Sequence, residues 1–146
     1  MTVALTGKEV AAKLEQQFAS DITESFNHFI LVKKEVIPDI ISFLKTEPNL
    51  DFNFLNYITA VDYLDYFEVV YQLTSLKYNH SIVIKTHCYG RENPSVPSIV
   101  DLYSTANVQE REIYDLMGII FDSHPNMTRM FLWEGFEGYP QRKDYL

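Results

Sequence analysis

Apolar residues recur at helical spacing near the start of the chain. They are Val10, Ala11, Leu14 and Phe18. This shared stripe predicts an amphipathic helix over residues 7–19. Thr6 and Glu9 occupy the two positions of a capping box in front of it. Leu5 and Val10 are spaced as a hydrophobic staple, so the helix has its own start signal.

A second amphipathic stretch surrounds Pro38. Proline suits the first turn of a helix, where a missing backbone N–H leaves no bond unmade. The apolar positions of this stretch share one side, and they are Ile37, Ile40, Ile41 and Leu44. Pro48 prevents the helix from continuing. We therefore expect a second helix that opens at Pro38 and packs this side against a core.

The middle of the chain is typical of strands instead. Residues 28–32 are a short run rich in large apolar side chains. Between Phe67 and Thr74, apolar and polar positions alternate, which predicts a half-buried strand. Residues 77–80 indicate a turn, and residues 81–89 then return as the second arm of a hairpin.

The remaining pattern sets the fold class. Residues 91–97 contain two prolines and predict an irregular connection, and residues 99–103 predict a further short strand. No internal repeat, low-complexity tract or linker divides the chain. We therefore expect one α+β domain: a two-layer α/β sandwich with a mixed, mostly antiparallel sheet, helices on one face and an irregular C-terminal docking tail.

A third helix is predicted over about residues 105–117. At 100° per residue its apolar positions are Ala106, Ile113, Tyr114 and Met117. Glu110 falls in the middle of that apolar arc. On the other side Arg111 and Asp115 are one turn apart and able to pair, with Glu112 beside them.

Glu110 needs a partner in this position. An ionised carboxylate on an apolar face costs several kcal/mol unless it is paired and hydrogen-bonded. We therefore expect Glu110 to meet an arginine or several backbone N–H groups, and Arg129 and Arg142 are the nearest candidates. Two roles stay open, because Glu110 either pins the tail to the helix or belongs to a subunit interface.

Gly118 is placed as the left-handed residue that ends this helix. The 28 residues after it show no sustained helical or strand period. They nevertheless contain large apolar side chains, namely Met130, Phe131, Leu132, Trp133, Phe136 and Tyr139. Such a segment either wraps over its own domain or lies against another protein.

Composition narrows the function classes. The 146 residues are 47% hydrophobic and 14% aromatic, which excludes disorder, and the net charge of -8 argues against binding to nucleic acid or anionic lipid. The apolar runs fall short of the ~20 residues that span a bilayer. Residues 1–5 lack a charged-then-apolar signal pattern. These observations favour a soluble intracellular protein.

No motif for metal or nucleotide binding stands out. The five glycines form neither a Gly-x-Gly-x-x-Gly nor a phosphate-binding loop. The single cysteine, Cys88, excludes an internal disulfide and any iron–sulfur cluster held by this chain alone. His87 and Cys88 are adjacent on a predicted strand and point to opposite faces, which disfavours shared ligation. We expect Cys88 to pack as a small hydrophobe.

An enzymatic alternative would use Glu110, Arg111 and His124 as an acid–base and anion-holding set, although nothing fixes a nucleophile near them. His124-Pro125 is better interpreted as a turn whose imidazole satisfies local backbone groups. Arginine is concentrated in this region, because three of the four arginines lie after residue 110. Its planar fork pairs with carboxylates in fixed geometry, which indicates a specified surface.

The same region contains residues at fixed spacing that identify a family. They are Glu110-Arg111-Glu112-x-Tyr114-Asp115-x-x-Gly118, then Phe121, His124-Pro125 and Arg129, and finally Gly138-x-Pro140-x-Arg142-Lys143-Asp144-Tyr145. This pattern resembles the C subunit of NADH-quinone oxidoreductase, the respiratory complex I, a domain also found in membrane-bound energy-converting hydrogenases. The specific match covers roughly residues 98–145.

The resemblance implies a non-catalytic scaffold subunit in the peripheral arm of the complex. Residues 1–118 would form the α/β core domain, and residues 119–146 an extended interface segment of the same domain. The chain would dock on the large D subunit near the iron–sulfur subunits, on the cytoplasmic side of the membrane and attached to it only indirectly. FMN and iron–sulfur clusters would belong to partner subunits, with no cofactor or metal in this chain.

The resemblance also names the interface residues. They are Glu110, Arg111, Glu112, Tyr114, Asp115, Gly118, His124, Pro125, Arg129, Gly138, Pro140, Arg142, Lys143, Asp144 and Tyr145. Arg142 and Asp144 are expected to be the most specific of them. The parent complex would be a quinone reductase fed by NADH or ferredoxin. Two alternatives stay open: the equivalent subunit of a membrane-bound hydrogenase, and a free-standing soluble enzyme or binding domain that reuses the fold.

Overall fold

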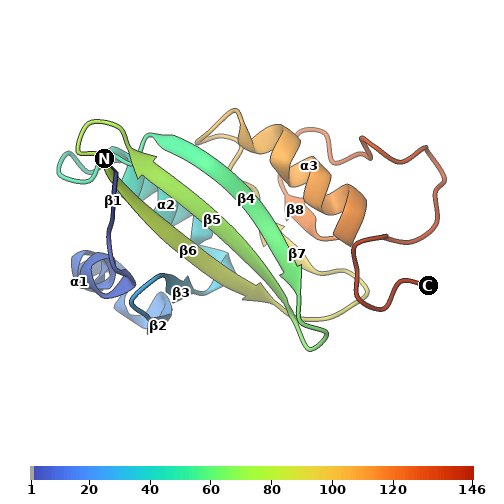
Figure 1. The fold of residues 1–146 in the computed structure, drawn as a ribbon, viewed down its shortest axis with the longest axis horizontal. Helices are drawn as coiled ribbons and strands as arrows, with labels where there is room; N and C mark the ends of the chain where they lie inside the picture. Colours follow the sequence, from blue (N-terminus) through green and yellow to red (C-terminus); the bar gives the residue numbers. More distant parts are fainter. Residues whose placement is uncertain (1) are drawn as a thin grey trace.

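A long hairpin forms the middle of the protein, whose computed structural model describes residues 2–146 (Figure 1). Met1, the first residue of the expected core domain, lies outside this range. Strands β5 (Phe67–Ser75) and β6 (His80–Cys88) pair antiparallel without a break in register. Asn79 in the connecting turn has a φ of 57°, a left-handed conformation that asparagine tolerates better than most residues. The predicted hairpin is confirmed.

Strand β4 (Phe54–Asp62) pairs antiparallel with β5 on the other side, and the sequence pattern did not predict it. The register shifts between Leu55 and Tyr57 because a bulge interrupts the ladder. The buried residues Leu55 and Ile58 are therefore three positions apart instead of two. This spacing breaks the alternation of apolar and polar residues by which a strand is recognised in a sequence.

The edge of β6 opposite β5 pairs with two short strands. β1 (Val3–Ala4) and β3 (Ile30–Val32) both run parallel to it. β2 (Ile22–Ser25), which was not predicted, pairs antiparallel with β3 and completes the strand order β2-β3-β6-β5-β4. The sheet is thus mixed and mostly antiparallel, as expected.

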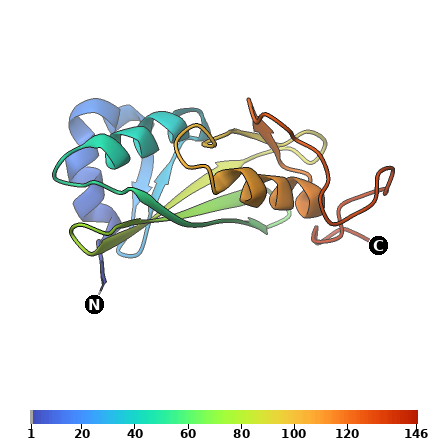
Figure 2. The ribbon, with the colours of Figure 1, turned by 90° about the horizontal axis from the view of Figure 1, so that it is seen from above.

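Three α-helices cover one face of this sheet (Figure 2). They are α1 (Gly7–Phe18), α2 (Ile37–Thr46) and α3 (Ala106–Met117), and two 3-10 turns, η1 (Ala19–Asp21) and η2 (Lys34–Val36), precede β2 and α2. The capping box of α1 is formed as predicted. The backbone N–H of Glu9 donates to Thr6 Oγ1 at 3.1 Å, and the N–H of Thr6 donates to Glu9 Oε2 at 3.0 Å.

The core lies between the helices and the sheet. Its largest fully buried side chains include Tyr71, Phe52, Phe67, Phe121, Leu14, Ile37 and Ile41. β5 is buried on both faces, so the prediction of a half-buried strand was wrong. The outer side chains of this central strand are covered by neighbouring strands, because Glu68 contacts Lys85 at 3.2 Å and His87 at 3.0 Å. Cys88 is buried on the core side, as predicted, and burial raises the pKa of its thiol to about 11.

A second, two-stranded parallel sheet links the segment before α3 to the segment after it. β7 (Ser95–Pro97) pairs with β8 (Ile120–Asp122), so the expected irregular connection over residues 91–97 contains a strand. Residues 99–103 form turns rather than the predicted strand. Two backbone N–H groups of this segment bond side chains instead of a neighbouring strand. The N–H of Ile99 donates to Glu110, and the N–H of Val100 donates to Ser98 Oγ.

The rest of the chain, residues 123–146, has neither helix nor strand and runs along the end of α3 (Figure 1). We call residues 119–146 the tail. Within the described residues, no helix is long and apolar enough to cross a membrane.

Candidate functional site

Asp115 on α3 is fully buried and holds the tail against the helix. Its Oδ2 atom accepts three consecutive backbone N–H groups, from Met130, Phe131 and Leu132, at 3.0, 2.6 and 3.2 Å. Its Oδ1 atom lies 3.2 Å from Nη1 of Arg129. Burial alone would raise the pKa of the Asp115 carboxyl, but these donors outweigh burial and the pKa is lowered. The carboxylate is therefore charged and completely satisfied.

Arg111 does not pair with Asp115, so the predicted ion pair one turn apart was wrong. Its guanidinium donates instead to the carbonyl oxygens of Thr128 and Arg129, each at 3.2 Å, and to Thr128 Oγ1 at 3.0 Å. The reason is that the tail already occupies both carboxylate oxygens of Asp115. Arg111 and Asp115 thus fasten successive residues of the same tail segment.

Arg129 is the charge partner of Asp115 and also closes a loop of the tail. It donates to the Asp115 carbonyl oxygen at 3.0 Å and to the Gly138 carbonyl oxygen at 2.8 Å. Its guanidinium carbon lies 5.4 Å from the ring centre of Phe136 and 4.9 Å from that of Tyr139. One arginine therefore connects α3 to both ends of residues 130–138.

Glu110, fully buried five residues earlier on α3, has different neighbours. Ser98 Oγ lies 2.5 and 3.1 Å from its two carboxyl oxygens, and the N–H of Ile99 donates to it at 3.0 Å. Burial raises the pKa of Glu110 to about 7 despite these donors. The expectation of an arginine or several backbone N–H groups was wrong, because this face of α3 meets the connection that follows β7. Glu110 fixes that connection and not the tail.

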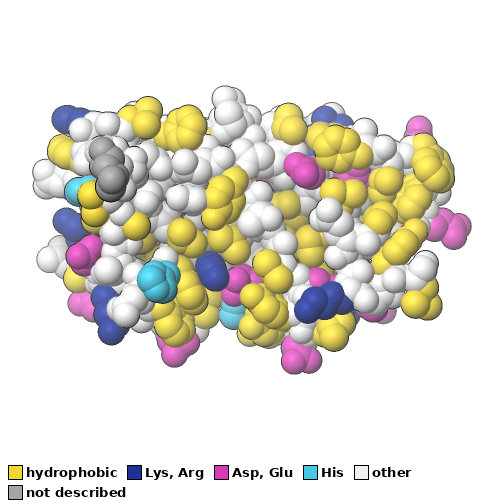
Figure 3. Space-filling view, in the orientation of Figure 1, with side chains coloured by type: hydrophobic (Ala, Val, Ile, Leu, Met, Phe, Trp, Pro, Cys, Tyr) yellow, Lys and Arg dark blue, Asp and Glu magenta, His cyan; other side chains and the backbone are white. Residues whose placement is uncertain are grey.

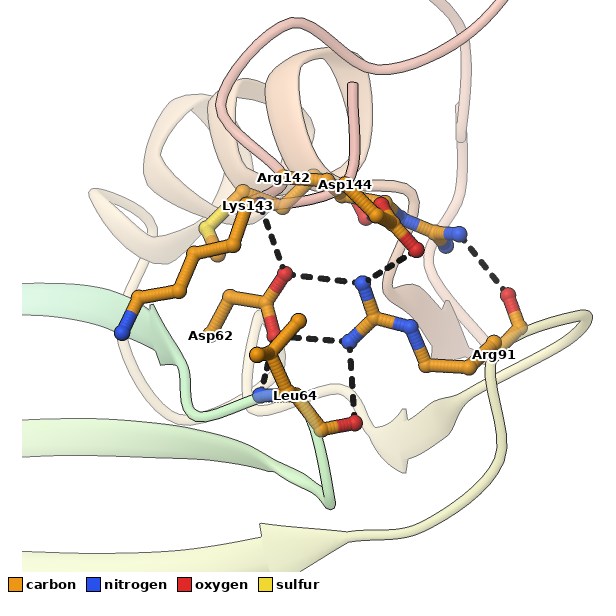
Figure 4. Close-up of polar contacts among 7 residues, drawn as sticks. Asp62, Leu64, Arg91, Arg142, Lys143 and Asp144 are labelled. Atoms are coloured by element: carbon orange, nitrogen blue, oxygen red, sulfur yellow. Dashed lines mark hydrogen bonds and ion pairs between the residues drawn. The ribbon is translucent and has the colours of Figure 1, made fainter. Parts of the chain in front are cut away.

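A second carboxylate, Asp62 at the end of β4, holds the last residues of the tail (Figure 4). Arg91 pairs with it in a bidentate manner at 2.6 and 2.8 Å. The backbone N–H groups of Leu64 and Lys143 donate to it at 2.8 and 2.9 Å. The Arg91 guanidinium holds the pKa of the Asp62 carboxyl well below its usual range. Arg91 also reaches Asp144 at 2.9 Å, so it joins both carboxylates.

Arg142 completes this arrangement from the tail itself. Its Nε donates to the carbonyl oxygen of Met117 at 2.6 Å, and its Nη1 donates to that of Arg91 at 2.8 Å. The guanidinium lies between the rings of Phe67 and Tyr139, at 5.1 and 4.8 Å. Its Nη2 is buried and finds no hydrogen-bond partner among residues 2–146. Arg142 therefore caps the C-terminal end of α3 with the tail.

Gly118 permits this close approach. It ends α3 with a φ of 77°, as predicted, and its N–H donates to the Tyr114 carbonyl oxygen. A Cβ atom at this position would lie 2.6 Å from Arg142 Nη2 and 2.7 Å from the ring of Tyr139. Only glycine gives both the left-handed backbone and the space that the tail occupies.

His124 lies in a turn, as interpreted, but its imidazole bonds one local backbone group and one on α3. Its Nδ1 accepts the N–H of Asn126 at 2.9 Å, so Nε2 bears the proton and donates to the Asn107 carbonyl oxygen at 3.0 Å. The three residues of the enzymatic alternative therefore have separate structural bonds: Glu110 with Ser98, Arg111 with the tail backbone, and His124 with Asn107.

The other residues that the resemblance named lie at the surface or between the tail and α3. Glu112 is exposed, and Tyr114 is half-buried with its ring 6.3 Å from that of Tyr139. Gly138 has a φ of 87°, and a Cβ atom there would lie 2.9 Å from the ring of Tyr145. Pro140 is half-buried, and the next residue, Gln141, donates its N–H to the Leu116 carbonyl oxygen at 2.9 Å.

Two aromatic residues in the middle of the tail are largely exposed. Phe131 is 62% exposed and Trp133 is 69% exposed, while Met130 and Leu132 between and beside them are half-buried. Figure 3 shows hydrophobic side chains gathered at the right-hand end of the molecule, where Figure 1 draws the tail, with acidic side chains at the edge. The tail thus wraps its own domain and presents apolar surface at the same time.

Sequence reasoning missed Asp62 and Arg91. Asp62 interrupts the apolar end of an unpredicted strand, and Arg91 is the one arginine outside the last third of the chain. An isolated acid at a strand end and an isolated arginine were the available signals, but 29 positions separate them.

A surface hollow lies between β2, β3 and β6, and its lining includes Thr23, Lys33, His87 and Tyr89. Glu110, Arg111 and His124 do not line it. In the part of the chain that the structure describes, no three His, Cys, Asp or Glu side chains come together in a way that could hold a metal ion.

Fold and site together define a small α+β domain whose buried carboxylates and arginines order a projecting tail. Comparison with known proteins then identifies its family. Residues 30–146 match the family model described as "Respiratory-chain NADH dehydrogenase, 30 Kd subunit". The chain belongs to this family.

Individual relatives agree with this assignment. The chain is 45% identical over 117 residues to the C subunit numbered 2 of NADH-quinone oxidoreductase from Rhizobium meliloti (strain 1021), covering 78% of this chain and 63% of that protein. It is 38% identical over 144 residues to the C subunit of NADH-quinone oxidoreductase from Herpetosiphon aurantiacus, covering 92% and 83%. The chain thus spans about three fifths of the length of the first curated relatives that it matches.

A solved structure shares the fold. It is a chain in the structure of the membrane-bound sulfane sulfur reductase, an archaeal respiratory membrane complex. The TM-score is 0.74 at 23% identity, over 95% of this chain and 85% of that chain. At this identity the likeness concerns the fold alone, and it confirms the expected α+β sandwich.

Proposed function

We propose that this chain is a non-catalytic scaffold subunit in the peripheral arm of a complex I-type NADH (or ferredoxin):quinone oxidoreductase, and that it docks on the large D subunit through its tail. The observation that carries the proposal is the tail itself. Asp115 and Asp62 fasten it with charged hydrogen bonds, yet Phe131 and Trp133 are largely exposed. Large apolar side chains that are held in place but mostly exposed are typical of an interface.

The names of the relatives support the kind of complex. The proteins from Rhizobium meliloti and Herpetosiphon aurantiacus are both named as C subunits of NADH-quinone oxidoreductase. In the proposed assembly the partners are the large D subunit and the iron–sulfur subunits. The FMN and the iron–sulfur clusters belong to partner subunits, and this chain keeps these cofactors at the correct spacing. The chain lies on the cytoplasmic side and reaches the membrane only through other subunits.

Arg142 and Asp144 receive a modified role in this proposal. Both were expected to contact the partner, but Arg142 bonds the end of α3 and Asp144 bonds Arg91. They therefore position the docking surface rather than form its centre. Lys143 and Tyr145, which are both exposed beside them, complete its edge.

The test is to tag the chain in its native cell, solubilise the membranes gently and identify the proteins that co-purify. We expect recovery together with a large catalytic subunit and cluster-bearing partners, whose identity would separate a quinone reductase from a hydrogenase. Recovery of the chain alone from the aqueous fraction would overturn the proposal. A cell that expresses the tag fused to an unrelated domain provides the control.

A further inference from the structure

Residues 130–137 form a loop with an unusual combination of exposure and order. Phe131 and Trp133 are the exposed large apolar side chains within it. The ring of Trp133 packs edge-to-face on Phe136 with centres 4.8 Å apart, and the N–H of Phe136 donates to the Trp133 carbonyl oxygen at 3.1 Å. The exposed indole is therefore supported from beneath by another ring.

Both ends of this loop are fixed by the same buried ion pair. Asp115 accepts the first three N–H groups of the loop. Arg129, its partner, donates to the carbonyl oxygen of Gly138 directly after the loop and lies over the Phe136 ring. Order of this kind lowers the conformational entropy that would be lost on binding, which is the advantage of a pre-formed docking element.

The charged side chains within the loop are both acidic. Residues 130–141 contain Glu134 and Glu137, both exposed, and no lysine, arginine or histidine. The guanidinium of Arg129 is neutralised by Asp115. The charged side chains within residues 130–141 are thus both acidic, and the whole chain has a net charge of -8. The Arg111 guanidinium lies at the start of the loop, where it bonds the backbone of Thr128 and Arg129. A complementary surface must be apolar at its centre and positive at its rim.

We infer that loop 130–137 is a pre-formed docking element, and that it inserts Phe131 and Trp133 into an apolar pocket, bordered by lysine and arginine side chains, on a partner protein. This inference rests on the proposed function and assigns the pocket to the large subunit. A lipid surface fits less well, because Glu134 and Glu137 would be repelled by anionic headgroups. Aromatic anchors at the centre of a polar rim are typical of binding hot spots in protein interfaces.

The test measures the dissociation constant of the complete chain for the large subunit of the same cell. We expect Trp133→Ala to weaken the association about tenfold or more, and Phe131→Ala to weaken it less. Leu76→Ala is the matched control, because Leu76 is 65% exposed in the turn between β5 and β6, at the other end of the sheet. Unchanged thermal melting would show that all three variants fold.

A second set of variants tests whether the acidic side chains of the loop contribute to binding. Reversal of both loop charges, Glu134→Lys with Glu137→Lys, is expected to weaken association severalfold at low salt, with a smaller effect at high salt. Glu15→Lys on the exposed side of α1 is the control for a change of charge remote from the tail.

The outcomes separate this inference from the proposed function. If the wild-type chain binds the large subunit and the loop variants bind equally well, the inference is wrong and the proposed function stands. If the wild-type chain does not bind it, both fail. Sedimentation of the chain with phosphatidylcholine–phosphatidylglycerol vesicles that is lost in Trp133→Ala would replace the protein partner by lipid. A Trp133-dependent homodimer in ultracentrifugation would replace it by a second copy of the chain.

Discussion

Helix α3 buries two carboxyl groups completely, Glu110 and Asp115, and they behave in opposite ways. The pKa of Glu110 is raised to about 7, whereas that of Asp115 is lowered. Neither side chain is open to water, but Glu110 lies deeper in the protein than Asp115, so burial raises the pKa of Glu110 more strongly. Their partners differ as well: a hydroxyl and one N–H for Glu110, but three N–H groups and a guanidinium for Asp115.

This comparison shows how one helix serves two connections. The Glu110 carboxyl, protonated over much of the acidic range, joins α3 to the turn after β7 through the uncharged Ser98 and Ile99. The charged Asp115 joins α3 to the tail and needs its ion pair to remain buried. A buried acid therefore contributes to stability according to its depth and to the number and charge of its donors, and each of the two positions predicts a different response to mutation and to pH.

The largest effect is expected from Asp115→Ala. The change leaves the Arg129 guanidinium and three backbone N–H groups without their acceptor, and breaking a buried pair in this way costs about 3–5 kcal/mol. Release of the tail into water would limit the loss. Urea unfolding measures the free energy, and hydrogen exchange locates the change, because the amides of residues 130–132 should lose protection while those of β5 keep it.

The control for this prediction is Glu112→Ala, an exposed acid on the same helix, which should leave both measurements within about 0.5 kcal/mol of wild type. Retained protection of the amides of residues 130–132 in Asp115→Ala would contradict the assigned role of the carboxylate.

The next effect is the pH dependence that Glu110 contributes. Between the ordinary value of 4.5 and the folded pKa of about 7, the folded protein keeps a proton that the unfolded chain has lost. The stability contribution of Glu110 therefore falls as pH rises through this window, by up to about 3 kcal/mol for the whole shift, and is constant above it. Glu110→Gln stays neutral and should be more stable than wild type at pH 8 by a similar amount.

Urea unfolding of wild type and Glu110→Gln at several pH values checks this. The difference between the two proteins should be small at pH 4 and largest above pH 7, and a difference that does not change with pH would show that Glu110 has an ordinary pKa. Glu112→Gln, on the exposed side of α3, should follow the wild-type profile throughout.

Much of the fold could be predicted because its patterns are local. The stripes of α1 and α2, the hairpin of β5 and β6, and the left-handed Gly118 each depend on residues that are close in the chain. β4 could not be predicted, because the bulge after Leu55 removes the period-2 alternation. β7 is only three residues long and contains proline, so it looked like a loop.

The sequence predicted most of the residues that form the candidate site, but only in part which of them bond one another. The sequence marks Glu110 as a buried acid on an apolar arc, but it does not show which segment faces that arc. Ser98 faces it, and the tail arginines bond elsewhere. The Asp115 carboxylate is taken by backbone N–H groups, which every residue except proline has and no pattern reveals. The partner of a buried side chain depends on which segment the fold brings next to it. The periodicity of the sequence indicates only that the side chain is buried.

The smallest effect is expected from Ser98→Ala, which removes one hydroxyl beside Glu110 and leaves the donors of Asp115 in place. Ser98 Oγ is the nearest donor to Glu110, and its bond favours the charged carboxylate, so Ser98→Ala should raise the pKa of Glu110 further. The lost hydrogen bonds should cost about 1 kcal/mol. A 13C NMR titration of the side-chain carboxyls measures both acids at once, and the pKa of Asp115 should not move. A fall in the pKa of Glu110 would contradict this prediction. It would mean that the Ser98 hydroxyl stabilises the protonated acid, whereas the donors of Asp115 stabilise the charged form.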